Sequence, residues 1–188
     1  VYQNIGLQYL LTGGNYFKLF YSNKTSTLLS TKGLEYITTL PANADVQNNM
    51  YGFGVKYEKL DYRLNPRKGF SLLGNAGIGT KTIKKNSALN PVVYEKLKLH
   101  TTQYTADFEG SIFIPVLERS TVKANIQSAF LYNETIFQNE LFRIGGLKTL
   151  RGFDEESIFS SMFSVLSLEY RFLLAENSYF NIFADGAY

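Results

Sequence analysis

The sequence predicts an all-β protein, and within that class an antiparallel up-and-down transmembrane β-barrel, of which the chain forms a fragment of about eight strands. Three observations lead to this prediction. Apolar and polar residues alternate along most of the chain, which is the period of two that a β-strand imposes on its side chains. The chain is rich in Tyr (14), Phe (15) and Gly (15), as membrane barrels with aromatic girdles are. The links between alternating segments are, in turn, short and long.

The composition excludes several classes of function. Among 188 residues, 19 Lys+Arg stand against 16 Asp+Glu, and a net charge of +3 lacks the dense basic surface of a nucleic-acid-binding protein. No cysteine is present, which excludes disulfides, thiolate metal sites and thiol nucleophiles, and His100 is the single histidine. A run of about 18 apolar residues, which a transmembrane helix needs, does not occur. We therefore expect no catalytic residue, no metal, no cofactor and no nucleic-acid partner.

The first four predicted strands each place apolar side chains at every second position. In chain order these apolar faces comprise Val1, Ile5, Leu7, Tyr9 and Leu11; Phe17, Leu19 and Tyr21; Tyr51, Phe53, Val55 and Tyr57; and Phe70, Leu72, Ala76 and Ile78. The third strand is the clearest, because its opposite face holds only Gly52, Gly54, Lys56 and Glu58. Each segment is close to the 9–11 residues that a tilted strand needs to cross a bilayer.

The last four predicted strands continue the same pattern. Their apolar faces comprise Tyr104, Ala106, Phe108, Ile112 and Ile114; Val122, Ala124, Ile126, Phe130 and Tyr132; Leu166, Leu168, Tyr170 and Phe172; and Phe180, Ile182 and Ala184. The alternation is already under way at Val1 and continues to Tyr188, so we expect the chain to be part of a longer protein.

The connections alternate strictly between short and long. The short ones are residues 12–15, 60–69, 115–120 and 173–178, and the long ones are residues 25–48, 84–100 and 133–161. In an antiparallel meander this order places all short turns at one end and all long loops at the other, as in outer-membrane barrels. Five lysines surround the second long loop, where we expect a solvated surface: Lys81, Lys84, Lys85, Lys96 and Lys98.

A soluble up-and-down barrel or β-sandwich would also alternate. Two features favour the membrane barrel. The polar face is charged, as a water-filled lumen would be, with Lys56, Glu58, Asp107, Glu109, Lys123, Glu169 and Arg171. The apolar face repeatedly ends in Tyr or Phe, where interfacial girdles lie.

The third long loop contains the most distinctive stretch, Gly145-Gly146 followed by Leu150-Arg151-Gly152-Phe153. It resembles the Gly-Gly…(Val/Leu)-Arg-Gly-(Phe/Tyr) signature of the BamA/TamA outer-membrane assembly superfamily, which includes the two-partner secretion transporters. Three further stretches are similar to motifs of that superfamily and occur in the same order, so that the resemblance extends from about Asn65 onward: Asn65-Pro66-Arg67-Lys68-Gly69, with Pro66 and Gly69 as a turn motif, Ser167-Leu168-Glu169-Tyr170, and Phe183-Ala184-Asp185-Gly186.

The resemblance implies that residues 1–188 are a partial outer-membrane β-barrel domain and that loop 133–161 folds inward. It implies that Arg151 contacts Glu169 and Asp185, both of which the alternation places on the polar face. Two departures stand out: Leu150 replaces the commoner valine, and three acidic residues at 154–156 could compete for Arg151.

By the same resemblance, the protein is a non-enzymatic factor for outer-membrane protein assembly, insertion or polypeptide translocation in a Gram-negative type bacterium. The partners implied are membrane lipids, unfolded outer-membrane or secreted polypeptides, and assembly lipoproteins. Two alternatives remain open. The barrel could anchor or export a patatin-like phospholipase, or it could be a passive eight-stranded barrel complete in itself, since eight strands can close.

Overall fold

The computed structural model describes residues 1–28, 41–87, 89–95 and 97–188. The predicted long links extend into positions 29–40, 88 and 96, which lie outside the described residues. Within the described ranges, no helix is long and apolar enough to cross a membrane.

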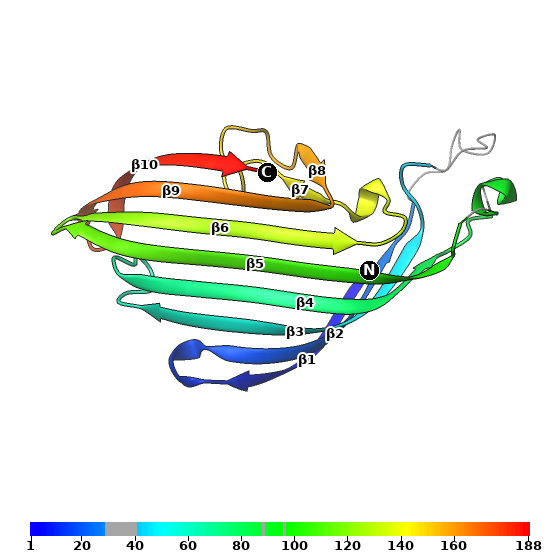
Figure 1. Ribbon diagram of the computed structural model, residues 1–188, viewed down its shortest axis with the longest axis horizontal. Coiled ribbons are helices and arrows are strands. Elements are labelled where there is room, and N and C mark those ends of the chain that lie inside the picture. Colours follow the sequence, from blue (N-terminus) through cyan, green and yellow to red (C-terminus); the bar gives the residue numbers. More distant parts are fainter. Residues whose placement is uncertain (29–40, 88, 96) are drawn as a thin grey trace.

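Eight strands form one antiparallel sheet in which each strand pairs with the next along the chain (Figure 1). In sheet order they are β1 (Tyr2–Leu10), β2 (Tyr16–Ser26), β3 (Val46–Leu60), β4 (Gly69–Ile83), β5 (His100–Leu117), β6 (Ser120–Tyr132), β9 (Met162–Ala175) and β10 (Ser178–Ala187). The all-β, up-and-down fold and the eight strands predicted from the alternation are thereby confirmed.

The remaining elements lie in the connections. Two three-residue strands, β7 (Phe142–Ile144) and β8 (Ile158–Ser160), pair with each other inside the third long loop. A short 3-10 helix, η3 (Gln138–Glu140), precedes β7 in the same loop, and two others lie in other links: η1 (Thr12–Gly14) and η2 (Pro91–Tyr94). The long loops lie at one end of the sheet and the short turns at the other, as the alternating link lengths predict (Figure 1).

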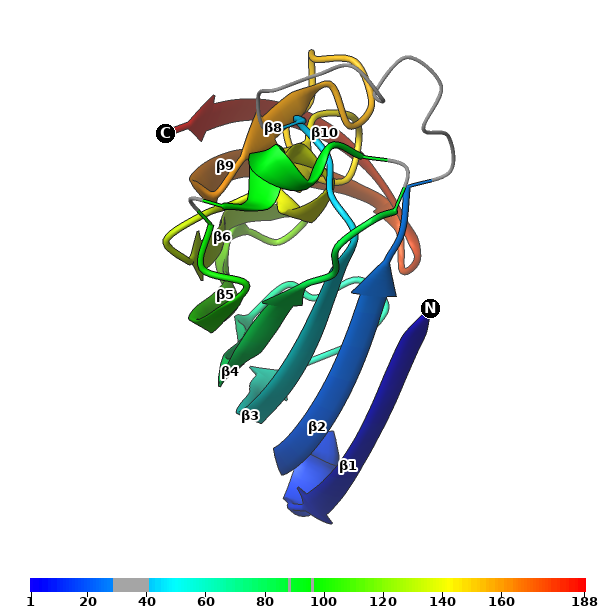
Figure 2. The ribbon, with the colours of Figure 1, turned by 90° about the vertical axis from the view of Figure 1, so that its right-hand side faces the viewer.

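The sheet is curved and open. Viewed along the strands, it curls from β1 to β10 (Figure 2). β1 and β10 form its two edges and are not neighbours in the sheet order. An eight-stranded barrel complete in itself needs that pairing, so this alternative is wrong for the structure observed.

The strand register aligns aromatic side chains in one row across the apolar face. The cross-strand partners in this row, from β2 to β6, are Tyr21, Tyr51, Ile78, Tyr104 and Tyr132. The rings of Tyr21 and Tyr51 lie 5.0 Å apart. Two residues nearer the long loops, the next row of the same face on β2 to β5 is polar: Asn23, Asn49, Thr80 and Thr102. This change from Tyr to polar residues is what a membrane–water interface requires.

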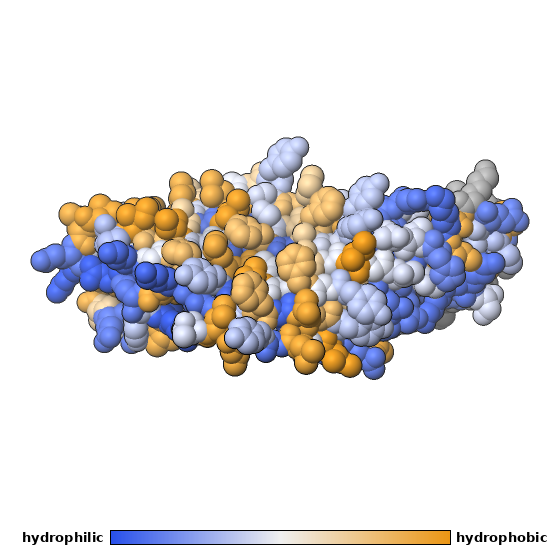
Figure 3. Space-filling view, turned by 60° about the horizontal axis from the view of Figure 1, so that its bottom comes forward, coloured by the Kyte–Doolittle hydropathy of each residue, from blue (hydrophilic) through white to orange (hydrophobic). Residues whose placement is uncertain are grey.

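The apolar face below this tyrosine row has the width of a bilayer core. On β5 it extends from Tyr104 to Val116, a span of roughly 40 Å at about 3.3 Å per residue. At a tilt near 45° this corresponds to a depth of roughly 28 Å, close to the apolar band of about 25 Å in outer-membrane barrels. Figure 3 shows hydrophobic side chains across the middle of this face and hydrophilic ones at the long-loop end.

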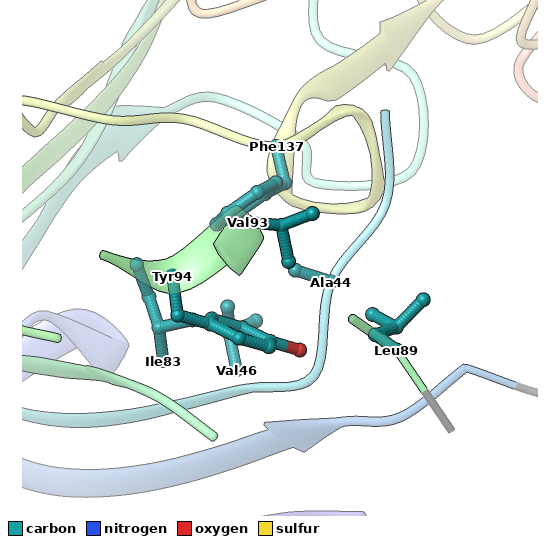
Figure 4. Packing of buried hydrophobic residues seen from close by; sticks show 7 residues of the cluster. All are labelled: Ala44, Val46, Ile83, Leu89, Val93, Tyr94 and Phe137. Carbon is teal, nitrogen blue, oxygen red and sulfur yellow. The ribbon is translucent and has the colours of Figure 1, made fainter. Parts of the chain in front are cut away.

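Many of the buried apolar side chains among the described residues belong to two clusters. We call the first the cap cluster, since it joins residues from the long loops and the strand ends beside them (Figure 4): Ala44, Val46, Ile83, Leu89, Val93, Tyr94 and Phe137. The second, the loop cluster, holds the third long loop on the polar side of β6 and β9: Ala129, Ile144, Leu150, Phe163 and Val165.

Candidate functional site

The loop cluster fixes loop 133–161 against the sheet. Ile144 of β7 and Leu150 of the loop are 5% and 4% exposed, and they pack on Phe163 and Val165 of β9. Burial of two aliphatic side chains stabilises the docked loop by roughly 1.5–3 kcal/mol each. Leu150 therefore sets the position of its neighbour Arg151, and leucine serves here in place of the commoner valine.

Gly145 allows the loop to turn back on itself. Its φ is +120°, and a Cβ atom at this position would lie 2.3 Å from the carbonyl oxygen of Asp154. The Thr149 hydroxyl closes the turn, because Oγ1 accepts from the backbone N–H of Gly145 at 2.8 Å and donates to its carbonyl at 2.8 Å. The turn thus brings the Asp154 backbone so close to position 145 that only glycine fits there.

Arg151 bridges carboxylates on two neighbouring strands. Its Nε and Nη2 donate to Asp185 Oδ2 and Oδ1 at 2.7 and 2.5 Å, and its backbone N–H donates to Oδ2 at 3.1 Å. Nη1 donates to Glu169 Oε1 at 2.9 Å. The carboxylate side chains are 3% and 9% exposed, and that of Arg151 is 15% exposed. The structure thus brings together the three residues that the resemblance groups.

A second arginine completes the network. Arg171 Nε and Nη2 donate to Glu169 Oε2 at 2.9 and 2.7 Å, so Glu169 lies between two guanidinium groups. Aromatic rings cover both cations. The centre of the Phe183 ring lies 3.7 Å from the guanidinium carbon of Arg151, and that of the Tyr179 ring lies 4.6 Å from the guanidinium carbon of Arg171. Sequence reasoning placed Arg171 on the polar face but not in this site, although its spacing of two from Glu169 on one strand was an available signal.

The other motif residues serve different purposes. Phe153 is 55% exposed and lies at the loop surface. Glu156 forms an exposed pair with Arg143 at 3.5 Å, on the loop itself. Among the ion pairs of the described residues, those of Arg151 are with Glu169 and Asp185, so the acids at 154–156 do not displace them.

The predicted turn motif lies in the turn between β3 and β4, at the short-turn end of the sheet (Figure 1). Pro66 and Asn65 are buried, and Asn65 Nδ2 donates to the carbonyl of Glu176 in the turn between β9 and β10 at 3.1 Å. Gly69 has a φ of +117°, and its Cβ would lie 1.9 Å from the Lys59 carbonyl oxygen. The motif therefore joins two turns and starts β4.

The expectation of a solvated lysine cluster is wrong for Lys81. Its side chain points to the polar face, is fully buried and forms an ion pair with Glu140. Lys84 and Lys85 are exposed, and Lys98 forms an exposed pair with Glu134 at 2.8 Å. Lys96 lies outside the described residues.

Arg151, Arg171, Glu169 and Asp185 are all used in ion pairs, so the arrangement is suited to holding the loop in place. Comparison with protein families and with curated proteins places this geometry in context. The model of the Omp85 superfamily domain matches residues 7–188, which include the whole site, and no curated protein matches the chain. The match confirms the resemblance to the BamA/TamA type. The chain belongs to the Omp85 superfamily.

Proposed function

We propose that residues 1–188 are part of a larger outer-membrane barrel that inserts, assembles or secretes other polypeptides, and that loop 133–161 braces its lumen. The Omp85 superfamily groups outer-membrane insertion and translocation proteins, which supports the general class. The single observation behind the brace is the hydrogen bonding of Arg151 to Asp185 and Glu169. We place the protein in a bacterial outer membrane, where its proposed partners are lipids, unfolded polypeptides and assembly lipoproteins.

The chemistry of the guanidinium explains why an arginine is suited to this role. Its planar fork presents two parallel N–H donors to Asp185 and a third donor to Glu169, a geometry that a lysine ammonium cannot supply. Because β9 and β10 are neighbours in the sheet, the bonds also tie these two strands to each other. A loop held in this way stays against the wall formed by β9 and β10.

The test uses Arg151→Ala, Arg151→Lys and Glu169→Gln in the full-length protein. We expect lower levels of folded outer-membrane proteins and slower growth for all three, because lysine keeps the charge but loses the fork. The matched control is Arg143→Ala, since Arg143 is an exposed arginine of the same loop and should leave both readouts unchanged. Normal assembly and growth in both Arg151→Ala and Glu169→Gln would show that the brace has no role in assembly.

Two further readouts separate the finer alternatives. Secretion of a passenger polypeptide, measured beside the level of folded outer-membrane proteins, distinguishes a transporter from an insertase. Phospholipase activity of the full-length protein distinguishes a barrel that anchors a patatin-like enzyme, for which we expect activity to depend on a separate domain and to survive Arg151→Ala.

A further inference from the structure

A second buried ion pair holds the first part of loop 133–161 to β4, a strand far from β9 and β10 in the sheet order. Lys81 of β4 is fully buried, and its Nζ pairs with the Glu140 carboxylate and donates to the Thr135 carbonyl at 2.6 Å. The ammonium also lies 4.8 Å from the centre of the Phe137 ring. Every one of these partners belongs to the first turn of the loop, before β7 begins. We call residues 133–141 the loop root.

The Glu140 carboxylate collects donors from three directions. Besides the ammonium of Lys81, Oε2 accepts the backbone N–H of Phe137 at 3.1 Å, and Oε1 accepts Nδ2 of Asn48 in β3 at 3.3 Å. The Glu140 side chain is only 4% exposed. A carboxylate buried to this degree is stable only where its charge is paired and its oxygens are hydrogen-bonded, and both conditions are met.

Neighbouring residues of the loop root extend the attachment to β2. Asn139 Nδ2 donates to Ser26 Oγ at the end of β2 and to the Ala44 carbonyl before β3, both at 2.9 Å. The backbone N–H of Gln138 donates to the Ala42 carbonyl at 2.8 Å. Since the chain leaves β6 at Tyr132, the loop root passes β5 to reach β4, β3 and β2.

The loop is therefore attached by charged groups at two places far apart in the sheet. Lys81 holds the loop root on β4, whereas Arg151 holds the tip on β9 and β10, and β5 and β6 lie between. The part of the loop between these two attachment points is also held in place, because β7, β8 and the loop cluster fix it to β6 and β9. Because the sheet is open between β1 and β10, we expect a loop that connects distant strands across its concave face to make it stiffer.

We propose that Lys81 is a positioning residue: with Glu140 it anchors the loop root, so that loop 133–161 acts as a strut that fixes the separation of β4 from β10. This role goes beyond the proposed assembly function, because it concerns the shape of the wall and holds for any substrate. It also differs from the Arg151 brace, which alone would tie the loop only to adjacent strands.

The test measures the distance across the wall in the full-length protein in lipid. Spin labels are placed at Ile78 on β4 and Ile182 on β10, which are 50% and 66% exposed on the apolar face. We expect one narrow distance distribution in the parent protein and a broader, shifted one after Lys81→Met. Lys98→Met is the matched control, because its exposed pair with Glu134 also joins the loop root, and the distribution should not change.

A local readout separates a strut from a simple contact. Hydrogen exchange of the Gln138 backbone amide reports on the loop root, since this N–H donates to the Ala42 carbonyl at 2.8 Å. We expect Lys81→Met to speed this exchange and to broaden the distance between β4 and β10. Faster exchange with an unchanged distance would overturn the strut, and so would retention of both native readouts.

A second variant covers the case in which Lys81→Met does not fold. Lys81→Met with Glu140→Gln removes both charges together, which proteins tolerate better than one unpaired buried charge. We expect this double variant to fold and to show the broader distance, whereas a native distance would overturn the proposal. These measurements do not depend on assembly activity, so failure of the strut and failure of the assembly function are distinguishable.

Discussion

The Arg151 site shows how one side chain can join parts of a protein that are distant in sequence. Two arginines and two acids form a compact group of ion pairs, and the ring of Phe183 lies against the Arg151 guanidinium. Removal of Arg151 leaves Asp185 buried without its counter-charge, and the loss of one partner from a well-buried pair typically costs about 3–5 kcal/mol. The geometry therefore depends on all members together.

The alternation of single residues predicted where Glu169, Arg171 and Asp185 point, but not what they touch. A period of two determines the face of a strand and nothing about which loop covers that face. Lys81 illustrates the limit: its partner Glu140 is 59 positions away, in a loop whose path depends on the packing of the cap cluster. No local pattern distinguishes this buried lysine from the exposed Lys84.

Gly69 provides a prediction at the residue scale. Gly69→Ala places a Cβ atom 1.9 Å from the Lys59 carbonyl at a φ of +117°, and we expect a loss of about 2–3 kcal/mol in the free energy of unfolding. Gly186→Ala is the control, because its Cβ would meet no atom within 4 Å and its φ is not positive. Urea unfolding in lipid, followed by circular dichroism, compares the two. Equal stability of both variants would contradict the prediction.

At the scale of elements, the turn between β3 and β4 is organised by one carboxylate. Asp61 Oδ1 accepts the backbone N–H groups of Tyr62, Arg67 and Lys68 at 2.9, 3.0 and 3.1 Å. Partial desolvation raises the pKa of this carboxyl, but the backbone hydrogen bonds outweigh it and hold the pKa below its usual value. The ionised form is therefore the one that stabilises the turn.

This turn predicts a pH dependence. Because the folded pKa of Asp61 is lowered, its contribution is complete above the unfolded value of about 4 and is lost as the pH falls through the folded pKa. We expect Asp61→Asn to be less stable than the parent near pH 7, with a difference that shrinks below about pH 4. Urea midpoints of both proteins across this range provide the measurement. A difference that is constant with pH would rule out the carboxylate as the cause.

The predicted strands and the order of the links were sufficient to derive the main sheet, but not the small elements. β7 and β8 have three residues each, too few to display a period, and lie in what the sequence presents as one long link. β3, β4 and β5 have 15, 15 and 18 residues, more than the predicted bilayer-crossing length. In β3 and β4 the surplus lies beyond the tyrosine row, where the outward side chains are polar and the apolar alternation is lost, and in β5 part of it does.

At the scale of the whole molecule, the tyrosine row defines how the sheet sits in the membrane. We predict that Phe108→Arg, two rows below Tyr104 on the apolar face, costs about 2–4 kcal/mol of folding free energy near the middle of the bilayer. Asn49→Arg lies beyond the row and should cost about 0–1 kcal/mol. Unfolding titrations in liposomes compare these two variants, and the opposite order would show that the belt is placed wrongly.

Curvature is the property of the whole sheet that the sequence does not reveal. Each strand-level pattern is satisfied equally by a flat sheet, a closed barrel or the curled open sheet observed (Figure 2). The ion pairs of loop 133–161 with β4, β9 and β10 join segments far apart in the chain, and no strand-level pattern predicts them.

The position of the loop's partners in the chain has a consequence for the order of folding. Lys81 precedes Glu140 by 59 residues, whereas Glu169 and Asp185 follow Arg151 by 18 and 34. During synthesis and insertion, the loop root can therefore find its partner while β9 and β10 are still absent. Arg151 has to wait for both, so its hydrogen bonds can form only after β9 and β10 are in place.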